Sequence, residues 1–206
     1  MSANNSTHRL APCPGRAQDG VAAIEFALLA LLFFTLVFGT FEVARLMYVY
    51  NTLHVVTHRV AQSVANVYPL ETTRIDELKR TAMFRDSAGE LVLAPPVSDT
   101  HIRIEYFALT RTGNSGALNW TPIKTTALPP NAAQHRQLCM NTPNAANCVR
   151  LIQVRICDPA DSDNCQSVRS RMMLPLIDLR VPLHKATSIA TPESFGYVPG
   201  ATPCPC

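Results

Sequence analysis

The sequence predicts an α+β protein in which a long N-terminal helix packs on a small antiparallel, disulfide-stapled β-sheet domain. Three observations predict it: an uninterrupted apolar run over residues 21–41, helical spacing of apolar residues after that run, and six cysteines in the last third of the chain. We therefore expect a leader peptide over residues 1–20, a transmembrane and stalk helix over 21–68, and an extracytoplasmic, mainly β domain over 69–206.

The composition excludes two broad classes of protein. Only 16% of the 206 residues are charged and 47% are hydrophobic, whereas a disordered chain needs high charge and low hydrophobicity. The net charge is +3 and no useful run of Lys or Arg occurs, so we expect no nucleic-acid partner. The apolar residues are unevenly spread, which is not typical of a soluble cytosolic protein.

Residues 21–41, VAAIEFALLALLFFTLVFGTF, predict one membrane span and therefore a lipid bilayer as a partner. A hydrocarbon core of about 30 Å needs about 20 helical residues. The run is too long for the apolar core of a secretory signal peptide, which has about 7–15 residues. Its one ionisable side chain is Glu25. Such a group costs roughly 2.5–3.5 kcal/mol at the centre of a span, so we expect Glu25 to be functional and paired.

The residues before the span suggest the pairing partner of Glu25. The first 20 residues are polar and end at Gly20. A cut between Gly20 and Val21 would leave a free amine on Val21 and make Glu25 the fifth residue of the mature chain. An amine and a carboxylate near the bilayer edge can neutralise each other between adjacent subunits. We therefore expect leader cleavage at Gly20 and Val21, and registration between subunits through Glu25.

Gly20 followed by VAAIEFALLALLFF, with FEVAR starting at Phe41, resembles the TadE-like minor pilins, or pseudopilins, of the Tad (tight adherence) system. The resemblance covers residues 16–67. Many such leaders carry Arg or Lys directly before the glycine, whereas this chain has Asp19, and its nearest basic residue is Arg16.

The resemblance implies a function, partners and a location. A membrane-embedded prepilin peptidase would cut between Gly20 and Val21. The mature protein would then act with other pilin or pseudopilin subunits and the pilus assembly machinery to assemble an Flp-type pilus for surface adhesion. It would cross the bacterial inner membrane once, with its N-terminus inside and its C-terminal domain in the periplasm or at the cell surface.

Beyond the span, apolar residues spaced three or four apart predict one face of a stalk helix. They are Leu46, Val49, Leu53, Val56, Val60, Val64 and Val67. Arg45 and Thr57 are among the polar residues between them. We expect the stripe to pack on the protein's own domain, with another pilin helix as the alternative, and Pro69 to end the helix at Tyr68. His54 and His58 lie four residues apart without an evident third ligand, which favours a solvated face over a metal site.

Cysteine parity agrees with leader removal, because that step deletes Cys13 and leaves an even number. The remaining disulfide candidates are Cys139, Cys148, Cys157, Cys165, Cys204 and Cys206. An oxidising compartment would join them as disulfides. The sequence does not select one set of pairs, but proximity favours Cys139 with Cys148 and Cys157 with Cys165.

Alternating segments in the C-terminal half predict three or four antiparallel strands that pack one face on the stalk helix. They lie at residues 101–110, 149–157 and 167–173, with 177–181 as a continuation. In the first segment, apolar Ile102 and Ile104 alternate with charged Arg103 and Glu105. In the second, Ile152, Val154 and Ile156 share one face.

Other segments give weaker signals. Residues 71–83 predict a short helix with Ile75, Leu78 and Ala82 directed inward. Residues 111–148 contain four prolines and little periodicity, so we expect a long irregular loop that could serve as a recognition surface. The acids Asp158, Asp161 and Asp163 lack the spacing of a calcium loop and indicate a turn.

We find no catalytic signature: no G-x-S-x-G elbow, P-loop or dinucleotide fingerprint. We therefore expect no enzyme activity, no cofactor and no metal site, since the cysteine spacings do not match a zinc site. Two other classes stay open. One is an unprocessed single-pass membrane protein with an extracytoplasmic ligand-binding domain. The other is a secreted enzyme cut after residue 40.

Overall fold

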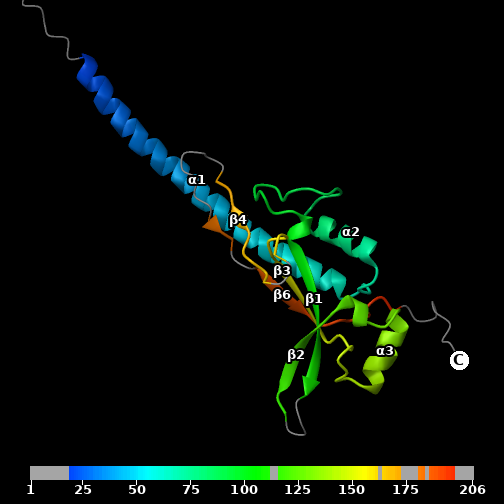
Figure 1. Cartoon of the computed structure of the whole chain (residues 1–206). Helices are drawn as coiled ribbons and strands as arrows, with labels where there is room; N and C mark the ends of the chain where they lie inside the picture. Colours follow the sequence, from blue (N-terminus) through cyan, green and yellow to red (C-terminus); the bar gives the residue numbers. More distant parts are fainter. Residues whose placement is uncertain (1–18, 112–115, 162–163, 173–180, 184–185, 198–206) are drawn as a thin grey trace, which may run out of the picture. The chain divides into compact units, whose positions relative to one another are not determined.

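The structure is a computed structural model of an α+β protein (Figure 1), and the chain divides into two compact units, Met1–Phe41 and Glu42–Cys206. The α+β class expected from the sequence is confirmed. The structure describes residues 19–111, 116–161, 164–172, 181–183 and 186–197.

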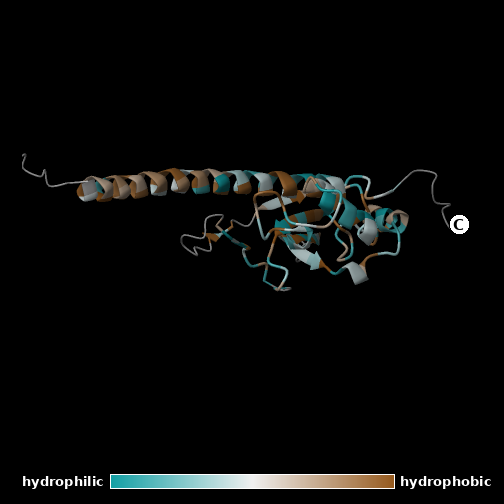
Figure 2. Ribbon diagram, turned by 90° about the horizontal axis from the view of Figure 1, so that it is seen from above, coloured by the Kyte–Doolittle hydropathy of each residue, from teal (hydrophilic) through white to brown (hydrophobic). Residues whose placement is uncertain are grey.

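Helix α1 (Asp19–Val64) has 46 residues and contributes to both units. In Figure 2 its first turns are coloured hydrophobic, and further along the helix hydrophobic and hydrophilic residues alternate. The second part carries the apolar stripe. Val49, Leu53 and Val56 are each at most 1% exposed and join the core with the strands of the sheet. The stripe therefore packs on the protein's own domain, as expected.

Helix α1 ends at Val64, before the expected end at Tyr68. The next residues form a turn in which the amide of Val67 donates to the carbonyl of Val64 at 3.1 Å. The carbonyl of Ala65 accepts the backbone N–H groups of Glu193 and Phe195, at 3.1 and 3.2 Å. A segment distant in the sequence therefore caps the helix before Pro69 is reached.

The second unit is built on a four-stranded antiparallel sheet with the order β2-β1-β3-β6. The strands are β1 (Ile102–Arg111), β2 (Leu118–Ile123), β3 (Leu151–Ile156) and β6 (Thr187–Ala190). Ile104 of β1 lies opposite Val154 of β3. The register brings the apolar residues of the two central strands onto one face.

The two faces of the central strands β1 and β3 differ in polarity, as the alternation of apolar and charged residues in the sequence predicted. Ile102, Ile152 and Val154 are at most 3% exposed, on the face that joins the core. On the other face Glu105 forms ion pairs with Arg103, at 3.1 Å, and with Arg155. A charged cross-strand ladder therefore covers the outer face, while the inner face packs on α1.

Helix α2 (Thr72–Ala82) confirms the short helix expected at 71–83. Ile75 and Ala82 are buried, and Leu78 is half-buried against the core. Two single helical turns are also present, η1 (Asp99–His101) and η2 (Thr125–Ala127).

The expectation of an irregular loop over 111–148 is wrong, because it contains strand β2 and helix α3 (Ala132–Asn141). Five of the six residues of β2 are exposed, as in an edge strand, so no alternation marks it. Pro122 lies in β2, and an edge strand tolerates proline because one side of it has no ladder. The side chain of Asn131 caps α3 by accepting the amide of Gln134 at 2.8 Å.

The strand expected at 167–173 is also wrong in length. In its described part, residues 167–172, only β4 (Arg169–Ser170) forms, and it pairs with β5 (Val181–Pro182) outside the main sheet. The expected continuation at 177–181 falls mostly outside the described residues. Strand β6, which completes the main sheet, was not expected.

Two disulfides staple the second unit. Cys139–Cys148 joins helix α3 to the segment before β3, and Cys157–Cys165 closes the segment after β3. These are the pairs that proximity in the sequence favours. Cys13, Cys204 and Cys206 lie outside the described residues.

Candidate functional site

The first unit presents an exposed apolar helix surface. α1 is long and apolar enough to cross a membrane, and none of the residues in its most apolar 18-residue window is buried. It therefore fits a single-pass membrane anchor. The large exposed apolar residues of α1 in the first unit are Val21, Ile24, Phe26, Leu28, Leu29, Leu31, Leu32, Phe33, Phe34, Leu36, Phe38 and Phe41.

Gly20, Val21 and Glu25 lie exposed in the first turns of α1. A Cβ added at Gly20 would meet no atom within 4 Å, as is also true at Gly39. Packing of the described residues therefore does not explain the glycine at position 20.

Glu25 differs from the other polar side chains of the apolar segment. Thr35 donates its hydroxyl to the carbonyl of Leu31 at 2.7 Å, and Thr40 donates to the carbonyl of Leu36, so both hydroxyls are satisfied by their own helix. The Glu25 carboxylate has no hydrogen bond or ion pair with any residue in the described part of the chain. An acidic side chain in an apolar segment is costly when it has no partner, which makes Glu25 a candidate for a contact outside the described residues.

A buried ion pair follows the apolar segment directly in the sequence. Glu42 and Arg45 are 8% and 7% exposed, and Nη2 of Arg45 donates to Oε1 of Glu42 at 2.6 Å. The same guanidinium donates to the carbonyls of Leu93, at 2.8 Å, and Arg171, at 2.6 Å, and to Oγ of Ser170 at 3.2 Å. Its planar fork of donors therefore fastens two distant segments of the second unit to α1.

From the sequence we expected Arg45 and Thr57 to be among the polar residues of the stalk helix. In the structure both side chains are buried. Thr57 is 0% exposed, donates to the carbonyl of His54 at 3.0 Å and accepts from Ser188 at 3.0 Å. The signal that could have revealed Arg45 is a Glu and an Arg three residues apart directly after the apolar run.

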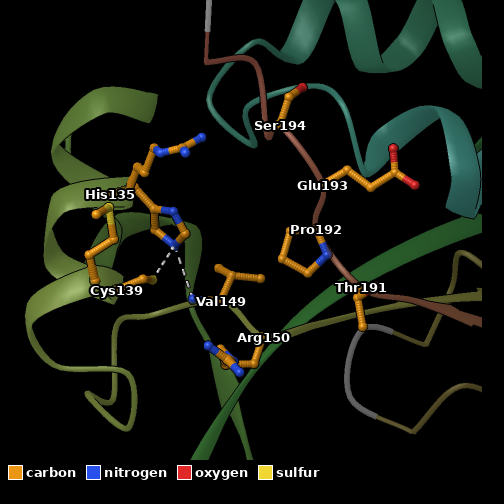
Figure 3. Close-up of a pocket in the computed structure, with 10 residues that line it drawn as sticks. His135, Cys139, Val149, Arg150, Thr191, Pro192, Glu193 and Ser194 are labelled. Carbon is orange, nitrogen blue, oxygen red and sulfur yellow. Dashed lines mark hydrogen bonds between the residues drawn. The ribbon is translucent and has the colours of Figure 1, made fainter.

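A hollow of about 540 Å³ lies beside helix α3 (Figure 3). Buried His135 accepts the amide of Val149 on Nε2 at 3.0 Å, and Nε2 lies 3.5 Å from Sγ of Cys139. Glu193 also lines the hollow, but its carboxylate points away from His135 in Figure 3. No acid–base pair is formed around His135 by the described residues that line this hollow.

Burial lowers the pKa of His135, which favours the neutral imidazole. Because Nε2 is the acceptor for Val149, the hydrogen-bond pattern assigns the proton to Nδ1. The ring also packs on Phe195, with ring centroids 5.0 Å apart. His135 thus fastens helix α3 to the start of β3 and to the segment that caps α1.

His135, Cys139 and Cys148 offer three ligand atoms within 4.8 Å of one another. Both sulfurs belong to the Cys139–Cys148 disulfide, so neither is a thiolate, the form that binds a metal. In this structure the cluster therefore stabilises the fold through its disulfide.

The other candidate ligand residues are placed as follows. His54 and His58 are both exposed on α1. Asp158 accepts the amide of Ala160 at 3.0 Å, and Asp161 accepts the amide of Asn164 at 2.9 Å, so the expected turn is confirmed. Asp163 lies outside the described residues.

Together these features define an α+β protein in which one helix of the described residues is long and apolar enough for a membrane anchor, and in which disulfides hold the second unit. Residues 20–62 match the family described as TadE-like protein, which confirms the resemblance seen in the sequence. The matched segment begins at Gly20, ends within α1 and covers well under half of the chain. No curated protein and no solved structure matches the chain.

Proposed function

We propose that this protein is a membrane-anchored minor pilin, or pseudopilin, that takes part in assembling a Tad/Flp-type pilus for surface adhesion. The observation that carries the proposal is the exposed apolar segment of α1 with its unpartnered Glu25, inside a stretch that matches the TadE-like family from Gly20 onward. An apolar helix that needs lipid and a carboxylate that needs a cation suit a subunit that associates with other subunits in the membrane.

Leader cleavage between Gly20 and Val21 by a prepilin peptidase supplies that cation. The new α-amino group of Val21 would lie one helical turn before Glu25, on the same face of the helix. The carboxylate of one subunit then pairs with the amine of its neighbour, which sets the register between their helices.

The topology proposed is N-terminus inside, with a single pass through the inner membrane and the second unit in the periplasm or at the cell surface. The two disulfides support this location for the second unit, because disulfides persist in oxidising compartments. The partners are the peptidase, other pilin subunits, the assembly machinery and the lipid bilayer.

The intact mass and N-terminal sequence of the protein from native membranes test the processing step. We expect a chain that starts at Val21, and a chain that still starts near Met1 would contradict cleavage. The Gly20→Leu variant should retain the leader. Gly39→Leu is the matched control, because a side chain is equally free of contacts there, and it should be processed normally.

A second prediction concerns Glu25. The Glu25→Gln variant should be cleaved and inserted but should lose most assembled pili, because the amide cannot neutralise a neighbouring amine. The matched control is Thr35→Val, which removes a polar group whose hydrogen bond stays within its own helix, and it should assemble pili normally. Pili on the cell surface are counted by shearing and immunoblotting. Normal pili with Glu25→Gln would disprove the pairing.

The hollow beside His135 favours one alternative, an unprocessed single-pass membrane protein whose extracytoplasmic domain binds a ligand. That function needs no leader cleavage, so the same mass measurement separates the two.

A further inference from the structure

A tight turn in the second unit exposes two apolar side chains. The carbonyl of Leu91 accepts the amide of Ala94 at 3.1 Å, and both residues are buried, at 4% and 1% exposure. Between them, Val92 is 59% exposed and Leu93 is 46% exposed. The base of the turn is therefore fixed in the core while its apolar tip faces outward.

The backbone at the tip is strained. Leu93 has a φ of 61°, in the left-handed region that normally holds Gly or Asn in a turn. A leucine there costs conformational energy, and its side chain is 46% exposed, so it is not part of the buried core. Strain of this kind persists where the surrounding structure enforces it, and it is frequent at functional sites.

Arg45 contacts the backbone of this turn. Its Nη1 donates to the carbonyl of Leu93 at 2.8 Å. Arg45 lies four residues after Phe41, the last residue of the first unit, so the groups that contact Arg45 lie where the chain enters the second unit. The apolar tip is therefore next to the start of the second unit.

Two basic residues lie beside the tip. The guanidinium that holds Leu93 also donates to the carbonyl of Arg171 at 2.6 Å. The side chains of Arg169 and Arg171 are exposed. An apolar tip next to cationic side chains suits the membrane interface, where acyl chains meet anionic phosphates.

We propose that the Leu91–Ala94 turn, together with Arg169 and Arg171, is a membrane-contact surface that enters the headgroup region of the leaflet from which α1 leaves the bilayer. Val92 and Leu93 insert, and the two arginines bind lipid phosphates. The inference requires the membrane anchor but neither leader cleavage nor pilus assembly, so it can fail or hold independently of them.

Tryptophan fluorescence of the full chain in vesicles tests this contact. The protein has a single tryptophan, which Trp120→Phe removes. In that background, Val92→Trp is reconstituted into phosphatidylethanolamine and phosphatidylglycerol vesicles whose acyl chains are brominated near the headgroup. We expect blue-shifted emission and quenching several-fold stronger than in the control. The matched control is Met140→Trp, at a 72% exposed apolar position on α3.

The possible outcomes separate lipid from protein contact. Quenching equal to that of the Met140→Trp control would overturn the proposal. A blue shift without lipid quenching would also overturn it, because the tip would then be covered by protein. Leu93→Trp is the second reporter in case Val92→Trp perturbs the turn. Quenching should weaken in the Arg169→Glu and Arg171→Glu double variant, whereas unchanged quenching would contradict the role of the arginines.

Discussion

Leu32 and Leu53 occupy the same helix, yet Leu32 is 60% exposed and Leu53 is 1% exposed. Around Leu32 the apolar residues cover the whole circumference of α1, so no single protein surface could bury them. Around Leu53 they form one stripe, which the sheet covers. The distribution of apolar residues around the helix, rather than helical propensity, decides whether each part requires lipid or a protein core.

Polar groups differ between the same two parts of α1. Glu25 has no partner among the described residues, whereas the guanidinium of Arg45 binds a carboxylate, a hydroxyl and two carbonyls. Arg45 therefore completes the fold of a single chain. The Glu25 carboxylate lacks such a partner within the described residues, and another molecule can supply one.

The largest expected effect comes from breaking the Arg45 cluster. Arg45→Ala leaves the Glu42 carboxylate buried without its partner, and loss of one member of a buried pair costs about 3–5 kcal/mol of unfolding free energy. Arg74→Ala is the matched control, because Arg74 pairs with Glu71 at the same spacing but both side chains are exposed, at 67% and 45%. It should cost less than about 1 kcal/mol.

Urea unfolding of the full chain in detergent micelles, followed by circular dichroism, measures both values. Equal losses for the buried and exposed pairs would mean that the Arg45 cluster does not stabilise the second unit. The Glu42→Leu and Arg45→Met double variant should recover part of the loss, because it removes both buried charges together.

A slightly smaller effect is expected when the same change, leucine to alanine, is made in each of the two parts of α1. Leu53→Ala removes packed atoms from the core and should cost roughly 2–5 kcal/mol of unfolding free energy. Leu32→Ala changes a side chain that contacts no core and should leave unfolding of the second unit unchanged. The same urea titration compares them, and a similar shift for both would contradict the division of α1.

The elements that sequence reasoning predicted are those whose two faces meet different surroundings. The stripe of α1 and the alternation of β1 and β3 mark one buried face each. Strand β2 escaped prediction because it is exposed on both faces, and α3 because His135 is its one buried residue. The Asn131 cap, the Cys139–Cys148 disulfide and the contacts of His135 hold α3, and none of them leaves a periodic pattern in the sequence.

The residues of the candidate site also differ in whether the sequence could predict them. Gly20 and Glu25 could be proposed from the sequence because their spacing to the apolar run is local. The Arg45 cluster could not, because its acceptors include the carbonyls of Leu93 and Arg171, which are 48 and 126 residues away. Backbone acceptors carry no residue identity, so no side-chain pattern reveals them.

The smallest expected effect concerns His135, the buried ionisable group near the C-terminal end of the stalk. Burial lowers its pKa in the folded state, so below about pH 6.5, the ordinary value for histidine, the unfolded state binds more protons than the folded state. The free energy of unfolding should therefore fall as the pH drops through that value. Burial also lowers the pKa of His101, although its acidic neighbours partly oppose the shift, so both histidines contribute in the same direction.

The urea midpoint measured across this pH range isolates the contribution of His135. In His135→Gln the amide oxygen can still accept the N–H of Val149 but does not titrate, so the fall in stability towards acid pH should become shallower without vanishing, since His101 remains. His58→Gln, at an exposed position on α1, is the matched control for the substitution itself. A His135→Gln profile as steep as that of the unaltered chain would mean that the buried imidazole is not what couples folding to pH, and would place the coupling at His101 or elsewhere in the second unit.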